Sequence, residues 1–278
     1  MTEAEKQYID LYTEASEAIK EHSAEVMNAV RDRAFEDFRR QGFPTRKVER
    51  YKYTDMEKIF APNYGLNINR IEFPVDPYAA FRCDVPNLST LLYFVVNDAF
   101  YEKRLPNVQP EEGVVIGSLR KAAKEHPELI ARYYARIAKT EEDAITALNT
   151  MLAQDGLFIY VPKNVQMEKC VQIINILRAD VSMMVNRRVL IVMEEGAKAK
   201  FLFCDHTADD HDFLATQVIE AYVGDNASLD LYCMEETHYK NHRVSNVYIE
   251  QQRDSRVNHN VICLLYTSPS PRDRQKSR

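Results

Sequence analysis

Four residues with metal-binding side chains stand close together in the second half of the chain. Cys204, Asp205 and His206 are consecutive, and His211 follows five positions later. Thiolates and imidazoles are ligands that Zn²⁺ and iron accept in proteins. A tetrahedral site needs a full set of such ligands, and the sequence has no CxxC pair to complete one. The alternative is a strand end that runs into the polar loop 207–212, and we therefore predict no metal site and no catalytic residue here.

Two further groups of polar residues could carry chemistry. His238 and His242 lie four positions apart after Glu235-Glu236, a spacing that would place both imidazoles on one face of a helix. Residues 237–243, however, have the composition of a loop between two strands, where this facing does not apply. The paired acids Glu194-Glu195 also fall in a turn, where solvation by water explains them. We assign neither group a role in acid–base catalysis.

Three residues of the same region are expected to point into a core. His259 occupies a position that is apolar in neighbouring copies of the repeat described below, so it needs a hydrogen-bond partner if it is buried. Cys170 and Cys233 lie in or beside apolar strands, where thiols behave as small hydrophobic groups. We therefore expect structural roles for all three and identify no cofactor-binding residue.

These candidate residues lie in a stretch, Leu157 to Val261, that repeats every 30 residues. In residues 197–203 the odd positions are apolar and Lys198 and Lys200 fall between them, which is the period of two of a strand. A polar turn comes before each such strand. The aligned apolar positions are Ile159, Val189, Ile219 and Ile249; Val171, Phe201, Leu231 and Val261; and Ala197, Ala227 and Val257.

A fixed period of this size is typical of stacked repeats. Two strands and two turns in 30 residues suit one turn of a β-solenoid, which buries its apolar face only against the next turn. A β-sandwich with regular strand spacing is the alternative. We predict a mainly β protein, with a parallel β-solenoid over residues 155–262.

Length and composition exclude several classes of protein. The chain has 278 residues and a net charge of -6, which argues against nucleic acid as its main partner. Apolar runs reach about five residues, too few for a membrane span. The first residues are polar and acidic, unlike a secretory signal. Five scattered cysteines are typical of reduced thiols, so we expect a cytoplasmic protein.

The sequence before the repeats predicts helices and one strand. A stripe of apolar residues at helical spacing covers residues 3 to about 40, with a break near His22. A strand is expected at 91–96, a helix at 118–138, and a second helix that begins with a capping box at Thr140. The predicted parts of the chain are 1–60, a helical region; 61–154, a small α/β region; 155–262, the β-helix core; and 263–278, a tail.

The segment from Gly42 to Thr54 is dense in basic and aromatic residues. It could bind nucleic acid, but aromatic rings that pack down under Lys and Arg stems would look the same. The acidic chain favours this second interpretation, a docking segment.

The same segment carries a family resemblance. Phe43-Pro-Thr-Arg-Lys-x-Glu-x-Tyr-Lys-Tyr-Thr54 resembles an N-terminal motif of the SufB/SufD family, with Tyr51 where the family often has Trp. Ala147 to Lys163 resembles a second motif, and residues 188–197 also fit. The resemblance covers roughly residues 30 to 262 and is closer to SufD than to SufB.

The resemblance implies a right-handed parallel β-helix between helical regions. It also implies a SufD-like, non-catalytic scaffold subunit for iron–sulfur cluster assembly, in a cytosolic complex with SufB-like and SufC-like proteins. A transient iron–sulfur cluster or reduced flavin would belong to the whole complex. The alternatives are a β-helix polysaccharide lyase or hydrolase, which needs carboxylates gathered on one face, and a plain interaction module.

The last residues differ from the rest. Cys263 to Asp273 resembles the conceptual translation of a sequencing adapter, although a natural disordered tail has a similar composition. We therefore expect a non-native tail and a truncated C-terminus. The helical domain and the histidine that the family carries near that end have no counterpart in this sequence. An uncapped solenoid is expected to be poorly soluble.

Overall fold

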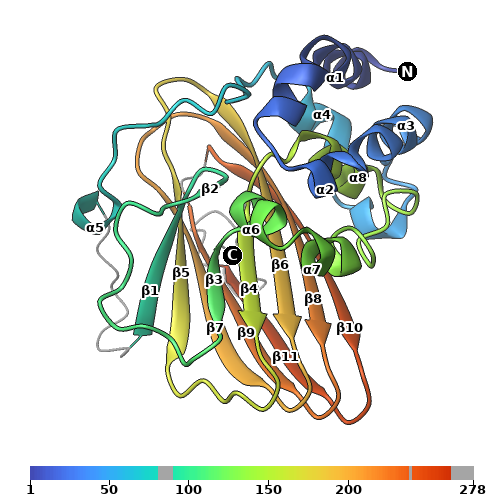
Figure 1. Ribbon diagram of the computed structural model, residues 1–278. Helices are drawn as coiled ribbons and strands as arrows, with labels where there is room; N and C mark the ends of the chain where they lie inside the picture. Colours follow the sequence, from blue (N-terminus) through green and yellow to red (C-terminus); the bar gives the residue numbers. More distant parts are fainter. Residues whose placement is uncertain (81–89, 238–239, 264–278) are drawn as a thin grey trace, which may run out of the picture.

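The computed structural model describes residues 1–80, 90–237 and 240–263, and it forms a β-solenoid of about four turns with all helices but the short α5 on one side (Figure 1). The sequence prediction of a mainly β solenoid is confirmed. The strands are β1 (Thr90–Val96), β2 (Ala99–Phe100), β3 (Val115–Ser118), β4 (Leu157–Val161), β5 (Cys170–Leu177), β6 (Met183–Met193), β7 (Lys198–Thr207), β8 (Phe213–Val223), β9 (Ser228–Glu236), β10 (His242–Gln251) and β11 (Arg256–Cys263).

The strands form two facing sheets. One has the order β11-β9-β7-β5-β1-β2 and the other β10-β8-β6-β4-β3. From β4 onward the chain passes between the sheets at every turn, so successive copies stack as parallel neighbours. Only β1–β2 and β3–β4 pair antiparallel among the described strands. The strands of the segment 61–154 therefore extend the same two sheets.

The 30-residue register holds in the middle of the solenoid and changes by two at its ends. Val171, Phe201 and Leu231 are direct partners along one sheet, as the sequence predicts. The prediction for Val261 is wrong, because it lies opposite Cys233. The pairing offset is 32 residues between β4 and β6 and 28 on both strands of the last turn. A shift of two keeps every side chain on its face, which is why the apolar pattern conceals it.

The main core fills the space between the sheets. Phe201, Leu231 and Ile219 are fully buried in it, and each comes from a strand with neighbours on both sides. Burial of this kind stabilises by roughly 1.5–3 kcal/mol for each large apolar side chain. The solenoid thus provides the rigid frame in which the polar residues are placed.

A helical layer covers the outer face of the five-stranded sheet (Figure 1). Met184 and Leu214, from the outer faces of β6 and β8, pack into the helical core. The predicted break near His22 is confirmed, and Gly42, with φ +63°, ends α3. The helices are α1 (Glu3–Glu21), α2 (Glu25–Asn28), α3 (Arg31–Gln41), the 3-10 helix η1 (Glu49–Tyr51), α4 (Met56–Phe60), α5 (Pro77–Ala80), α6 (Leu119–Glu125), α7 (Pro127–Tyr133) and α8 (Ala144–Leu152).

The start of α8 differs from the prediction. The capping box at Thr140 is wrong, because Asp143 is the N-cap and accepts a hydrogen bond from the Thr146 amide at 2.8 Å. Thr140 instead donates its hydroxyl to Asp37 at 2.6 Å. Its side chain therefore joins the turn before α8 to α3, and the next suitable residue caps α8. The cap expected at Ser118 is confirmed.

Strands β10 and β11 are the last of their sheets among the described residues. Each pairs with one neighbour only, and Val261 and Ile262 remain 55% and 49% exposed. The tail was expected to begin at residue 263, and Cys263 is the last residue of β11. The rest of the expected tail, residues 264–278, lies outside the described residues.

Candidate functional site

A band of polar side chains crosses the interior of the solenoid at one end of the apolar core. Asp205 shares the inward face of β7 with Phe201 and forms an ion pair with Arg187 of β6 on the facing sheet. Its other oxygen lies 3.4 Å from Nε of Arg243, which also pairs with Glu235. Arg187 and Asp205 are 3% and 1% exposed. The band therefore joins the two sheets through alternating charges.

The charges in the band compensate one another. Burial lowers the pKa of Arg187 against the opposing attraction of Asp205, and the nearby Arg243 lowers it further. Nε of Arg187 also donates to the Asn97 carbonyl at 2.8 Å. Two guanidinium groups thus face two carboxylates, and each carboxylate is held as an ion-pair partner. Such a network fixes the pairing of the sheets rather than providing a free acid or base.

The structure separates the four residues that resembled a metal site. Cys204 points to the opposite face of β7 from Asp205 and is buried, with its sulfur 3.5 Å from Nε2 of Gln172. Nδ1 of His206 lies 3.8 Å from Glu236. His211 belongs to the loop after β7. Residues 1–80, 90–237 and 240–263 contain no group of three or more potential metal ligands.

Cys233 and His259 meet at the open end of the solenoid. The Cys233 sulfur lies 3.9 Å from Nε2 of His259, and burial raises the pKa of this thiol to about 11. His259 faces inward, in direct register with Leu231, yet it is exposed because no described strand covers β11. Partial burial and the charge of Arg243 lower its pKa. The pair holds a protonated thiol and a mainly neutral imidazole at neutral pH.

The remaining candidates are structural or exposed. Cys170 is half-buried on β5, and burial raises its pKa. Glu195 lies in the expected turn and pairs with Lys163 at 2.6 Å on the surface. His242 is exposed at the start of β10, and His238 lies outside the described residues.

Sequence reasoning missed a second buried ion pair, which joins the helical layer to the sheet. Arg188 of β6 and Glu220 of β8 are fully buried and lie 2.5 Å apart. Glu220 also accepts hydrogen bonds from the four backbone amides of residues 135–138, at 2.9–3.3 Å. Arg188 donates to the Thr150 hydroxyl at 3.0 Å. The available signal was a charged residue beside an apolar run in each strand: Arg188 before Val189–Met193 in β6, and Glu220 after Val218 and Ile219 in β8.

The basic and aromatic segment 42–54 docks through two aromatic side chains: Phe43, which packs into the helical core, and Tyr51. Tyr51 is buried and donates its hydroxyl to Asp143 at 2.7 Å. The same carboxylate group accepts from Arg50 at 3.1 Å and from Asn246 of β10 at 2.9 Å. The docking interpretation is therefore confirmed for Tyr51, whereas Tyr53 is 90% exposed. Asp143 connects the N-terminal motif, α8 and the last strand of one sheet.

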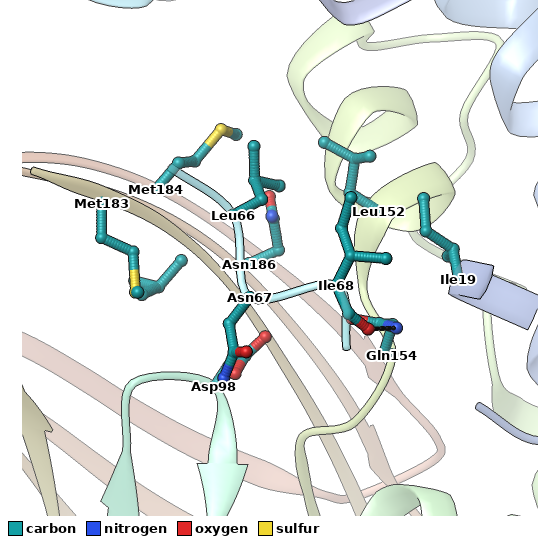
Figure 2. A pocket seen from close by; sticks show the side chains of 11 residues that line it. Ile19, Leu66, Asn67, Ile68, Asp98, Leu152, Gln154, Met183, Met184 and Asn186 are labelled. Carbon is teal, nitrogen blue, oxygen red and sulfur yellow. Dashed lines mark hydrogen bonds between the residues drawn. The ribbon is translucent and has the colours of Figure 1, made fainter. Parts of the chain in front are cut away.

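A small cavity lies between the helical layer and the sheets (Figure 2). Asn67, Asp98 and Asn186 contribute polar atoms to its wall, and Gln154 donates to the Ile68 carbonyl at 2.7 Å. Its volume of about 10 Å³ is close to the space of one water molecule, so it does not hold a substrate.

Fold and site together define a two-sheet parallel β-solenoid protein with a helical layer and internally paired charges. Residues 2–173 match the model of the SufBD protein N-terminal region, and residues 175–266 match that of the SUF system FeS cluster assembly, SufBD core domain. The chain belongs to the SufBD family. The sequence-based recognition is thereby confirmed.

Curated relatives agree with this assignment. The chain is 29% identical to the iron–sulfur cluster assembly protein SufD of Bacillus subtilis over 185 residues, which cover 66% of this chain and 41% of that protein. It is 32% identical over 124 residues to a SufBD family protein of Synechocystis, covering 43% and 25% of the two chains. A SufBD family protein of Arabidopsis thaliana matches at 29% over 141 residues, or 49% and 30%. These matches span less than half of each relative's length.

Proposed function

We propose that this chain acts as a SufD-like, non-catalytic scaffold subunit of iron–sulfur cluster assembly, in a cytoplasmic complex with SufB-like and SufC-like proteins. The observation that carries the proposal is the match to both SufBD family models over residues 2–173 and 175–266. The geometry supports it, because the buried carboxylates Asp205 and Glu220 serve as partners of arginines. In the described residues no helix is long and apolar enough to cross a bilayer.

Co-expression tests this proposal. The tagged chain is produced together with SufB-like and SufC-like proteins from one bacterial source and purified through its tag. Light scattering after size-exclusion chromatography then gives the molar mass of the purified material. We expect a complex of defined stoichiometry that contains the tagged chain. A folded chain that elutes without either partner, at micromolar concentrations of all three, would contradict the scaffold role.

The polysaccharide lyase alternative has less support. Its chemistry needs carboxylates that reach a substrate on one outer face. In the described strands Glu220 is fully buried under the segment 135–138, and Asp205 and Glu235 lie on the inward faces with arginine partners. Release of unsaturated products from pectate by the purified chain would restore this alternative.

A further inference from the structure

A groove with a volume of about 760 Å³ runs between α2 and the pair α6 and α7. Figure 1 shows these helices side by side at the lower edge of the helical layer. Small apolar residues form much of its lining, and several of them are only partly buried. They are Ala24, Val26, Ala29, Val30, Ala123, Pro127, Ala131 and Ala135.

The rim of this groove is basic, although the whole chain is acidic. Four cationic side chains line it and only one carboxylate, Glu25, does so. Lys20 pairs with Asp32, and Arg33 pairs with Glu141. Lys124 has no ion pair within the described ranges, and the Arg136 guanidinium donates only to the Ala131 carbonyl. Two cations on one side of the groove are therefore available to an anionic partner.

We propose that this groove binds an amphipathic helix of a partner protein whose apolar face is flanked by acidic residues. Small side chains such as Ala29 and Ala131 let another backbone approach closely, and the cationic lining residues Lys124 and Arg136 are exposed to solvent. This arrangement fits the helix-in-groove mode, in which an apolar stripe supplies contact and charges at the edge fix orientation. The proposal does not depend on the scaffold function.

A synthetic peptide tests the proposal directly. An 18-residue fluorescent helix with leucines on one face and glutamates on both sides is titrated with the full chain, and binding is followed by anisotropy. A peptide of identical composition in scrambled order is the first control. We expect saturable binding of the amphipathic peptide that weakens with added salt, and at least tenfold weaker binding of the scrambled one.

Matched variants locate the contact. The double substitution Lys124→Glu with Arg136→Glu should weaken peptide binding at least tenfold. Lys163→Glu with Lys200→Glu changes the net charge equally on the solenoid surface and should leave binding within twofold. Ala29→Trp places a bulky side chain on the exposed lining of the groove and should also weaken binding, while a circular-dichroism melt verifies that each variant folds.

Several results would overturn the proposal. Equal weakening by both double variants would show that only the net charge matters. Equal affinity for a single-stranded RNA would indicate a nucleic-acid surface, and absence of saturation at millimolar chain concentrations would show that the groove does not bind such a helix.

Discussion

The inner strands β8 and β9 and the edge strands β10 and β11 carry the same sequence pattern but differ in burial. Residues 30 positions apart in the sequence lie on the same face of their strands, although they are not direct partners in the ladder, and they provide pairs for comparison: Glu220 with Glu250, Leu231 with Val261, and Cys233 with Cys263. The first member of each pair is at most 3% exposed, and all three second members are exposed.

The difference shows that burial in a solenoid depends on the neighbouring turn. Strand β9 pairs with both β7 and β11, whereas β11 pairs with β9 alone among the strands that the structure describes. The segment 135–138, which follows α7, also covers Glu220 of β8, while Glu250 is exposed near the end of β10. Each matched pair therefore compares one residue type, or one apolar class, in two environments.

Glu220→Gln should give the largest effect. The substitution leaves Arg188 charged and buried without its carboxylate partner, which typically costs about 3–5 kcal/mol. We expect urea denaturation to show a loss of this size in the free energy of unfolding. Glu250→Gln, the matched change at an exposed position, should stay within about 0.5 kcal/mol. Comparable losses in the two variants would refute the inner–edge distinction.

Leu231→Ala should cause the second-largest loss in the free energy of unfolding. Leu231 is fully buried between Phe201 and His259 in the ladder, so removing its side chain should cost roughly 2–5 kcal/mol. Val261→Ala should change the unfolding free energy by less than about 0.5 kcal/mol, because that side chain is half-exposed. Thermal and urea melts measure both, and a near-neutral Leu231 variant would disprove its place in the core.

Cys233 should make stability fall at alkaline pH. Burial raises the pKa of its thiol from 9 to about 11, so the folded state keeps the proton to higher pH than the unfolded state does. The contribution is complete below about pH 9 and is lost as pH rises to 11, by at most roughly 2–3 kcal/mol. Urea melts from pH 8 to 11 should show a shallower decline in Cys233→Ala. Cys263→Ala is the control, and an unchanged slope in Cys233→Ala would contradict the prediction.

The sequence predicted the solenoid because its information is local and periodic. Alternation along 197–203 defines a strand, and the 30-residue spacing defines the stack. The sequence pattern could not reveal the two-residue changes in pairing offset at the ends of the solenoid. A shift by an even number of residues leaves the same side chains on the inward face. Arg188 and Glu220 come together because β6 pairs with β8 and because the helical layer covers this part of the sheet. Residue spacing in the sequence predicts neither contact. The sequence placed Asp205 in a candidate metal site with Cys204 and His206. Because successive side chains of a strand point to opposite faces, Asp205 points inward and its two neighbours point outward.

Val261→Lys should have the smallest effect on stability of these substitutions. It tests whether the edge strand β11 mediates self-association. Val261 lies on the inward face of β11, which is an edge strand among the described residues and can therefore pair with a second copy of the chain. A charge that points inward at this edge should reduce self-association without changing the melt by more than about 0.5 kcal/mol. Val181→Lys is the matched control, because Val181 is equally exposed but lies in the loop before β6. Sedimentation velocity over a range of concentrations should show fewer oligomers for Val261→Lys alone. An equal decrease in both variants would mean that association depends on surface hydrophobicity in general and not on the open edge.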